Sequence, residues 1–333
     1  MNKHTVVLTG AAGQDAFYLQ QELVTKFPDI EILGLYRGQD EERLQKLTKE
    51  MPAVTFVRGD ITDAASMNSL IENYQPFAVF NLAGVTSIPI ALSAPYLTYK
   101  VNTEGVINIL EAIRRHSPST RLFQASTSEM YGNATDSSAL DEQSRMVPTS
   151  PYGISKLMAH LACRTYRVSY GLHVSCAISF NHESPGHRPP IFVTRKVTQA
   201  AARIAAGKQQ VLEMGNLAAC RDWGFAGDYV KAFIKMVYAD IADDYVVGTG
   251  KAHSVEDLVA TAFSMADIDN WKDYVVVADS NLRPEDNNYL RANPLKIQQK
   301  LGWRAETTFE DLIKMMVVHD LELETGKPVL ALG

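Results

Sequence analysis

Short apolar runs alternate with longer amphipathic segments through the first half of the chain. The apolar runs are Thr5–Leu8, Glu31–Leu35, Val54–Val57, Ala78–Leu82, Leu122–Ala125 and Val174–Phe180. The amphipathic segments are Asp15–Lys26, Asp63–Asn73, Thr98–His116 and Pro151–Ser169. Continuous apolar strands separated by helices are typical of a parallel sheet covered on both faces. The pattern therefore predicts an α/β fold with a doubly wound sheet.

This alternation of apolar and amphipathic segments stops after Phe180, where the chain reads NHESPGHRPPIFVTRK. A central strand would not tolerate this Pro-rich, basic segment. Further on we expect helices at Val193–Ala206, Asp228–Tyr238, Val255–Met265 and Phe309–His319, with strands near Tyr245–Val247 and Tyr274–Val277. We therefore expect a Rossmann-type nucleotide-binding domain over residues 1–181, to which part of 216–250 returns, and a smaller α/β substrate domain over 182–333.

Composition limits the classes of partner. The chain has 333 residues, of which 46% are hydrophobic and 21% charged, and its formal charge is −6. It lacks the basic stripe of a general nucleic-acid binder. No apolar run approaches the roughly 18 residues that would span a bilayer, and the first residues do not resemble a signal peptide. Three cysteines without a CxxC pair fit a reducing compartment. We expect a cytoplasmic protein that binds neither nucleic acid nor membrane.

A glycine-containing turn, TGAAGQDAFYL, joins the first predicted strand to the first helix. Gly10 and Gly13 allow a tight turn, so that a pyrophosphate can approach backbone N–H groups at a helix N-terminus. The alternative is an ordinary helix-start turn. The strand–turn–helix context favours a nucleotide site.

The end of the second strand indicates which dinucleotide binds. An acid there would accept a hydrogen bond from a ribose 2′-hydroxyl, whereas arginine would favour a 2′-phosphate. This chain places Arg37 and Arg43 there, which favours NADP over NAD. The alternative is two solvated arginines, because acidic residues stand beside them. Asp60, at the end of the third strand, could meet an adenine amino group or cap the next helix.

Two further motifs carry candidate chemistry. Tyr152 and Lys156 in SPYGISKLMAH stand at i, i+4 on one helix face. A nearby ammonium favours a phenolate, so this pairing could make Tyr152 a base near neutral pH. In QASTSEMYG, Thr127 ends a strand and Glu129 follows. Ser and Thr side chains commonly bond backbone groups in the turn after a strand. An acid near Tyr152 and Lys156 could instead act in catalysis. Histidine and cysteine spacing matches no metal motif, so we predict no metal.

With these motifs in order, the chain resembles the extended short-chain dehydrogenase/reductase superfamily and, within it, the GDP-mannose 4,6-dehydratase family. The similar segments include TGAAGQDAFYL, GDITD, NLAG, QASTSEMYG, SPYGISK, FNHESP, FVTRK, RDWG, HSVEDLV, LRPEDNNYL and KLGW. GQD, FNHESP with FVTRK, and RDWG are the more specific ones, because they suggest a GDP-sugar enzyme.

The resemblance implies a reaction in which NADP is reduced and reoxidised. Thr127 would hydrogen-bond the sugar O4, Tyr152 would deprotonate it, and Lys156 would bind the nicotinamide ribose. Hydride would pass from C4 to NADP, and the ketone would acidify the C5 proton. Glu129 would remove that proton and help the C6 hydroxyl leave as water. Hydride would return to C6, giving GDP-4-keto-6-deoxy-mannose.

The resemblance also implies a binding surface for each ligand and a homodimer or homotetramer. The expected cofactor contacts are Gly10, Gly13, Gln14, Asp15, Arg37, Arg43, Asp60, Ile61, Leu82, Ala83, Gly84, Tyr152 and Lys156. The expected contacts with GDP-mannose or a related GDP-sugar are Thr86, Ser87, Ser128, Asn181, Glu183, Val193, Lys196, Arg221, Arg283 and Asp286. Among these, the Val193 backbone and Lys196 would read guanine, and Arg221 and Arg283 would clamp phosphates.

The chain departs from the family pattern beside the expected sugar site. Val85-Thr86-Ser87 stands where the family usually has Gln-Ser-His, and Gly186–Pro190 replaces a shorter basic run. The alternative function is therefore a GDP-sugar epimerase, which would use the same NADP and the same Thr, Glu, Tyr and Lys side chains through a keto intermediate. A second alternative is a catalytically silent nucleotide-sugar-binding relative. The Tyr152–Lys156 pair argues against it.

Overall fold

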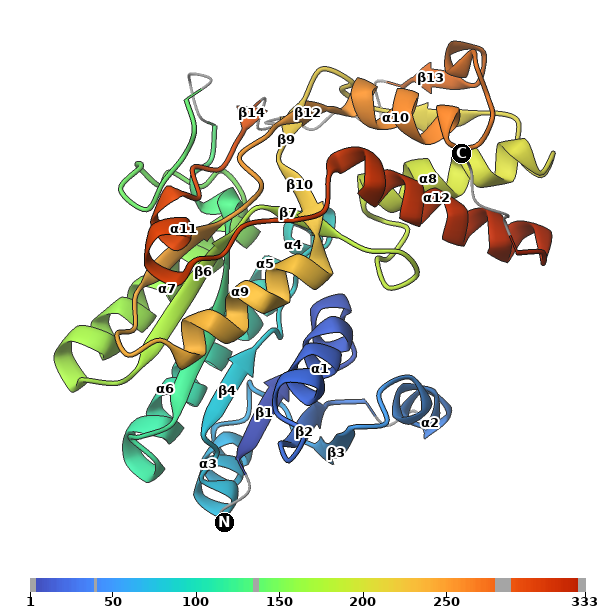
Figure 1. Cartoon of the computed structure of the whole chain (residues 1–333). Coiled ribbons are helices and arrows are strands. Elements are labelled where there is room, and N and C mark those ends of the chain that lie inside the picture. Colours follow the sequence, from blue (N-terminus) through green and yellow to red (C-terminus); the bar gives the residue numbers. More distant parts are fainter. Residues whose placement is uncertain (1–3, 39–40, 134–137, 279–288, 329–333) are drawn as a thin grey trace.

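Seven parallel strands form the central sheet of the protein (Figure 1). The computed structural model describes residues 4–38, 41–133, 138–278 and 289–328. In sheet order the strands are β11 (Asp244–Val247), β6 (Val174–Ser179), β5 (Arg121–Thr127), β4 (Ala78–Asn81), β1 (Thr5–Thr9), β2 (Glu31–Tyr36) and β3 (Val54–Arg58). Strands β2 and β3 extend the sheet on one side of β1, and β4, β5, β6 and β11 extend it on the other. Doubly wound sheets bind ligands at the point between β1 and β4 where the strand order changes direction.

Helices cover both faces of this sheet, as the alternating apolar pattern predicts (Figure 1). Helices α1 (Gln14–Lys26) and α9 (Ala226–Tyr238) pack on one face through a shared apolar cluster. Helices α3 (Ala64–Tyr74), α6 (Gly105–His116) and α7 (Pro151–Tyr170) pack on the other. The apolar strand residues are almost fully buried, and burial of this kind contributes about 25 cal/mol per Å² of apolar surface.

The second half of the chain forms a smaller unit above the sheet's carboxyl edge (Figure 1). Its apolar core joins α8 (Val193–Ala205), α10 (Val255–Ser264) and α12 (Phe309–Thr325). Short strands make three small sheets: β7 (Asn181–Glu183) with β10 (Trp223–Phe225); β12 (His253–Ser254), β9 (Cys220–Arg221) and β14 (Tyr289–Leu290); and β8 (Leu212–Met214) with β13 (Val275–Val277). The turn η3 (Trp271–Asp273) belongs to this unit, whereas helix α11 (Leu295–Leu301) packs against α9 and β11 of the sheet unit.

The structure differs from the predicted elements in three places. The charged segment after β2 is a helix, α2 (Glu41–Glu50), rather than a loop. The expected helix Thr98–His116 is divided into α5 (Pro95–Tyr99), a π-helical turn η1 (Lys100–Glu104) and α6, and α4 (Ile88–Ser93) precedes it. A short 3₁₀ turn, η2 (Ser128–Met130), follows β5. None of the helices in the described ranges combines the length and the apolar character needed to cross a membrane.

Candidate active site

A cavity of about 1060 Å³ lies at the sheet's carboxyl edge, between the sheet and the smaller unit. Residues from both halves of the chain line it. Fourteen of the predicted site residues do so: Asp15, Leu82, Thr86, Ser87, Thr127, Ser128, Glu129, Tyr152, Lys156, Asn181, Glu183, Val193, Lys196 and Arg221. The fold thus brings all four expected catalytic residues and eight of the ten expected substrate residues to one cavity, with four of the thirteen expected cofactor residues.

The other predicted residues stand apart from the cavity lining or beyond the described residues. Gly10, Gly13, Gln14, Arg37, Asp60, Ile61, Ala83 and Gly84 do not line this cavity. Arg283 and Asp286 lie outside the described residues, as does the side chain of Arg43. Trp223 forms part of the cavity wall and stacks on Phe309 at 5.9 Å between ring centroids.

The turn after β1 has the backbone that a pyrophosphate site needs. Gly10 adopts φ +64°, and a Cβ there would lie 2.7 Å from the Ala83 nitrogen, so both the conformation and the close packing require glycine. Gly13 begins α1 without a side-chain cap, which leaves N–H groups of the first turn available to an anion. The hydroxyls of Ser87 and Ser179 line the cavity, buried and without a hydrogen-bond partner among the described residues. These features fit a bound nicotinamide dinucleotide.

Gln14 and Asp15 make contacts that the sequence did not indicate. Gln14 Nε2 donates to the His182 carbonyl at 3.0 Å, and Gln14 Oε1 accepts from the Ser184 hydroxyl at 2.9 Å. Asp15 Oδ2 lies 3.1 Å from His182 Nε2. The Gln14 side chain therefore joins the turn after β1 to β7 and to Ser184, the residue that follows it.

The buried Asp15–His182 pair is electrostatically coupled. Burial alone would raise the pKa of Asp15, but the charge and hydrogen bond of His182 lower it below its usual value. Burial disfavours the cationic ring, yet the Asp15 carboxylate raises the pKa of His182. The imidazole also stacks on Tyr229 with centroids 4.7 Å apart. The pair therefore favours the imidazolium and the carboxylate together, at the start of α1.

Arg37 and Asp60 meet each other at the far end of the nucleotide region. Arg37 is exposed, and its guanidinium lies 3.9 Å from the Asp60 carboxylate. Asp60 accepts hydrogen bonds from the Thr62 backbone and hydroxyl, both at 2.9 Å. The N-cap of α3 is Asp63 rather than Asp60, because the Asp63 carboxylate accepts from the Ala65 amide. The capping alternative for Asp60 is therefore wrong.

The four candidate catalytic side chains come from the end of β5 and the start of α7. Thr127 Oγ1 accepts from the Glu129 amide at 3.3 Å and is hydrogen-bonded to Tyr152. Lys156 Nζ donates to the Ala125 carbonyl at 2.8 Å. Helix α7 begins sharply because the Ser150 hydroxyl caps the Gly153 amide and Pro151 occupies the first position. This start fixes where Tyr152 enters the cavity.

The expected depression of the Tyr152 pKa is wrong for this structure. Burial raises the pKa of Tyr152 to about 12, and the negative charge of Glu129 acts in the same direction. The hydrogen bond from Thr127 and the charge of Arg188 lower it. Burial also lowers the pKa of Lys156 to about 8, although Asp15 opposes this. Desolvation outweighs the helical pairing of Tyr152 with Lys156.

Arg188, which sequence reasoning did not single out as a site residue, enters the cavity from the Gly186–Pro190 segment. Its Nε lies 2.7 Å from the buried Glu183 carboxylate, and its guanidinium lies over the Phe192 ring at 3.6 Å from the centroid. Thr194 donates a second hydrogen bond to Glu183 at 2.7 Å. The altered segment thus places a fixed cation in the same cavity as Tyr152.

Asn102 was also missed, although it connects two parts of the site. It lies in the π-helical turn η1, where Oδ1 accepts from the Val85 amide at 2.8 Å and Nδ2 donates to the Val85 carbonyl at 3.0 Å. The same Nδ2 is 3.0 Å from the Ser155 hydroxyl. π-Helical turns occur often at functional sites, but a continuous amphipathic pattern does not reveal one.

Comparisons with known proteins identify the family. The sequence model for GDP-mannose 4,6 dehydratase matches residues 7–316. "GDP-mannose 4,6 dehydratase 2" of Arabidopsis thaliana is 38% identical, covering 97% of this chain and 88% of that protein. The Vibrio cholerae GDP-mannose 4,6-dehydratase is 32% identical, covering 99% of this chain and 97% of that protein.

Solved structures confirm the predicted fold class. UDP-glucose 4-epimerase of Thermus thermophilus, complexed with NAD, has a TM-score of 0.80 and 25% identity, covering 95% of this chain and 98% of that one. A dTDP-glucose 4,6-dehydratase of Streptomyces venezuelae, with NAD bound, has a TM-score of 0.83 at 22% identity, covering 97% and 99%. The sequence and fold together confirm the resemblance: the chain belongs to the GDP-mannose 4,6-dehydratase family, whose members are hydro-lyases of the extended short-chain dehydrogenase/reductase type.

Proposed function

We propose that the protein binds NADP and GDP-mannose and forms GDP-4-keto-6-deoxy-mannose. The observation that carries this proposal is the single cavity lined by Thr127, Glu129, Tyr152 and Lys156 together with the residues expected to hold the nucleotide sugar. NADP, when bound, would take a hydride from C4 of the sugar and return it at C6, so the reaction has no net redox change. The protein's own groups move the protons.

Tyr152 is the proposed base for the sugar O4 proton. Thr127 and Arg188 both lower the pKa of Tyr152, Thr127 through a side-chain hydrogen bond and Arg188 through its charge, so both favour the phenolate. Lys156 stands one turn further along α7, with its ammonium held by the Ala125 carbonyl. Removal of the O4 proton allows C4 to become a ketone. The ketone then makes the adjacent C5–H acidic.

Glu129 is the proposed base for C5. It lines the cavity two residues beyond Thr127, with its backbone fixed by the Thr127 hydroxyl. Its carboxylate takes the C5 proton while the C5=C6 double bond forms and the C6–O bond breaks. The same proton passes to the departing hydroxyl, so that water leaves. When hydride returns to C6, C5 takes up a proton from solvent, which offsets the O4 proton that Tyr152 removed. A positioned general base and acid of this kind contributes roughly 10²–10⁴-fold in rate.

The remaining cavity residues support binding of a guanosine diphosphate. Lys196 and Val193 stand at the first turn of α8 and line the cavity, as proposed for guanine recognition. Arg221, which is buried in β9, lines the same cavity and suits a diphosphate oxygen. Contacts from Arg283 and Asp286 remain proposals from the sequence alone.

We also propose NADP rather than NAD. Arg37 follows β2, where a 2′-phosphate would lie, and its exposed guanidinium is held loosely by Asp60. Replacing Arg37 with alanine should weaken NADP binding about tenfold and leave NAD binding nearly unchanged, because the salt bridge to a 2′-phosphate is lost. Equal losses for both cofactors, measured by fluorescence titration, would contradict this.

We propose that the protein is cytoplasmic, with a nucleotide-binding domain at 1–181 and a substrate domain at 182–333. We also propose that it forms a homodimer. Ile154, Met158 and Leu161 form an exposed apolar stripe on α7, and Ile107 of α6 is exposed beside them. These positions are spaced i, i+4, i+7, which is one helix face. A second copy of the same face would bury the stripe symmetrically.

One experiment separates the candidate functions. Purified protein is incubated with GDP-mannose and NADP, and the product is followed by mass spectrometry and NMR. Loss of one water with formation of a 4-keto-6-deoxy sugar supports dehydration. Unchanged mass with a new diastereomer would replace the proposal with epimerisation. Binding without conversion would exclude both reactions for this substrate and favour a silent relative.

A further inference from the structure

Helix α7 contacts three successive residues at the end of β5. Tyr152 is hydrogen-bonded to Thr127, Lys156 Nζ donates to the Ala125 carbonyl at 2.8 Å, and His160 Nδ1 lies 3.0 Å from the Ser126 hydroxyl. Residues 152, 156 and 160 are spaced i, i+4, i+8, so they share one face of the helix. His160 is thus the third member of a row whose first two members are the proposed catalytic pair.

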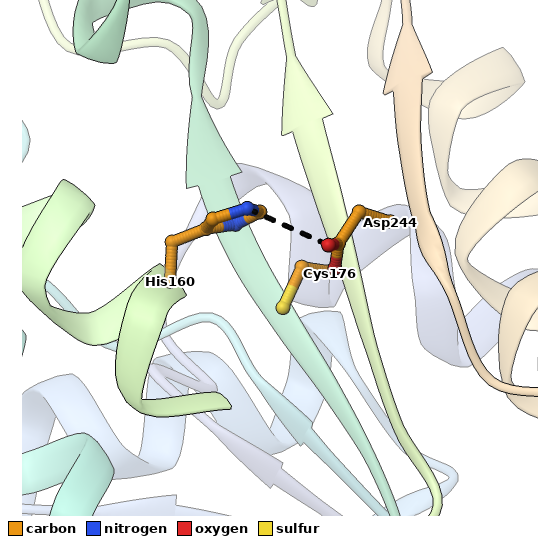
Figure 2. A group of neighbouring side chains, drawn as sticks. All are labelled: His160, Cys176 and Asp244. Atoms are coloured by element: carbon orange, nitrogen blue, oxygen red, sulfur yellow. Dashed lines mark ion pairs between the residues drawn. The ribbon is translucent and has the colours of Figure 1, made fainter. Parts of the chain in front are cut away.

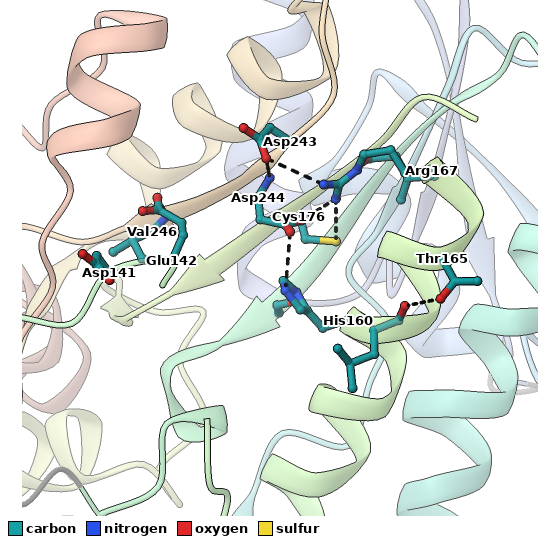
Figure 3. Close-up of polar contacts among 12 residues, drawn as sticks. Asp141, Glu142, His160, Thr165, Arg167, Cys176, Asp243, Asp244 and Val246 are labelled. Carbon is teal, nitrogen blue, oxygen red and sulfur yellow. Dashed lines mark hydrogen bonds and ion pairs between the residues drawn. The ribbon is translucent and has the colours of Figure 1, made fainter. Parts of the chain in front are cut away.

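The other side of the His160 ring faces a buried polar cluster. Nε2 lies 3.7 Å from the Asp244 carboxylate of β11 (Figure 2). The Cys176 sulfur of β6 lies within 4.8 Å of the ring and of this carboxylate. Asp244 is in turn hydrogen-bonded to Arg167 (Figure 3). Arg167 Nε also donates to the Val174 carbonyl at 2.7 Å. With Ser126 of β5, the neighbours of the ring therefore come from three strands, and the Arg167–Asp244 hydrogen bond joins β11 to α7.

The charge of the ring follows from these neighbours. The groups that face it are Asp244 on β11, Cys176 on β6, and Arg167 on α7, with Cys163 hydrogen-bonded to Cys176. Burial and Arg167 disfavour an imidazolium, but the hydrogen bond to Cys176 and the Asp244 carboxylate raise the pKa of His160 above its ordinary value. In the cationic form both ring nitrogens are donors, one toward Ser126 and one toward Asp244.

These side chains do not make a convincing metal centre, although the donor atoms of His160, Cys176 and Asp244 lie within 4.8 Å of one another. The permanent cation of Arg167 contacts two of the three donors, with Asp244 hydrogen-bonded and the Cys176 sulfur at 3.9 Å. The hydrogen bond with Cys163 and burial raise the pKa of the Cys176 thiol, whereas a metal requires the thiolate. Hydrogen bonding accounts for the cluster better than metal binding does.

We propose that His160 is a positioning residue for the reaction: clamped by Asp244, it holds Ser126 and thereby fixes the strand end that carries Thr127 and leads to Glu129. This inference rests on the proposed function for its kinetic consequence, but not for its structural one. Displacing catalytic groups by about 1 Å can cost roughly 10²-fold in rate. His160 touches Ser126 rather than the reacting atoms, so its loss should lower kcat more than it changes KM.

Three variants of the full-length protein test the proposal. His160→Ala removes the contact to Ser126, and His160→Asn returns an amide nitrogen close to the Nδ1 position. His173→Ala is the matched control, because His173 is a half-buried histidine at the opposite end of β6, where its Nε2 bonds the Ala239 carbonyl at 2.9 Å. Each variant is measured for kcat and KM with GDP-mannose and NADP, for thermal stability, and for hydrogen exchange of residues 125–129.

We expect His160→Ala to lower kcat about 10- to 100-fold with little change in KM, and to speed exchange at 125–129 about tenfold. His160→Asn should recover most of both losses, whereas His173→Ala should lower thermal stability alone. The proposal is overturned if His160→Ala keeps wild-type exchange at 125–129, or if it changes exchange and kcat no more than the control does. The exchange measurement decides the matter even if GDP-mannose proves not to be the substrate.

Discussion

The partly buried Asp15–His182 pair predicts that two single substitutions have unequal effects on stability. At an effective dielectric constant of about 20, two unit charges 3.1 Å apart attract with about 5 kcal/mol. His182→Gln leaves the Asp15 carboxylate buried with Gln14 as a neutral partner, at 3.2 Å. Removing one member of a fully buried ion pair typically destabilises by about 3–5 kcal/mol, and the side chains of this pair keep 16% and 21% of their exposure. We expect the loss of stability in His182→Gln to lie near the lower end of this range, because Asp15 can take up a proton.

Asp15→Asn should lower the free energy of unfolding less than His182→Gln does, because the imidazole becomes neutral and neither side chain is left with an unpaired charge. The loss is then a charge-assisted hydrogen bond, about 1–3 kcal/mol. The double variant should resemble Asp15→Asn alone, so the two effects should not add. Urea unfolding at constant ionic strength gives each free energy by linear extrapolation.

The pH dependence has a definite direction. His182 has a raised pKa, so its share of the coupling is complete below its unfolded value of about 6.5 and is lost as pH rises through the higher folded value. Asp15 has a lowered pKa, so its share is complete above about 3.9 and is lost as pH falls through the lower folded value. The coupling should therefore be largest between about pH 4 and pH 6.5. At about pH 6, the two single variants could lose equal free energy of unfolding, with the double variant losing the sum. That result would refute the charge pairing.

Three further predictions concern Lys156, Arg188 and the α7 surface. The pKa of Lys156 is about 8 in the folded protein, against about 10.5 in the unfolded chain. As pH rises from about 8 to about 10.5, the wild type should therefore gain about 3 kcal/mol of unfolding free energy relative to Lys156→Met. A difference in urea unfolding that stays constant with pH would contradict this. Arg188→Gln should raise the pKa of Tyr152, seen by NMR of 13C-labelled tyrosine, and lower kcat about tenfold; an unchanged pKa would show that Arg188 does not act on the phenol. Leu161→Glu should convert a dimer to a monomer in analytical ultracentrifugation, whereas Lys300→Glu on α11 should not; a dimer that survives Leu161→Glu would place the interface elsewhere.

The sequence predicted the sheet well because its central strands are buried on both faces and so form uninterrupted apolar runs, although the edge strand β3 is only partly buried. It also placed Thr127, Tyr152 and Lys156 correctly in one cavity, since a strand end and an i, i+4 helical pair are local features. It could not show that His182 approaches Asp15, because 167 residues separate them and the contact depends on β7 crossing over the phosphate turn.

Other features depended on tertiary packing in the same way. The π-helical turn at Asn102 keeps the apolar periodicity of a helix, so the pattern gave no sign of it. Arg188 lay in a segment whose composition indicated only a loop, and its pairing with Glu183 requires the fold. The pKa of Tyr152 rises rather than falls because the depth of burial, which spacing cannot supply, outweighs the neighbouring charges.

The role of Glu129 is the central claim, and a single-turnover experiment with Glu129→Gln in deuterated water tests it most directly. Reduced nicotinamide is followed by absorbance, and the sugar product by mass spectrometry and NMR. The variant should still oxidise C4 and accumulate reduced cofactor, while water loss and deuterium entry at C5 fall by roughly 10²–10⁴-fold. If Glu129→Gln eliminates water and exchanges C5 at the wild-type rate, another group is the base and the proposed mechanism is wrong.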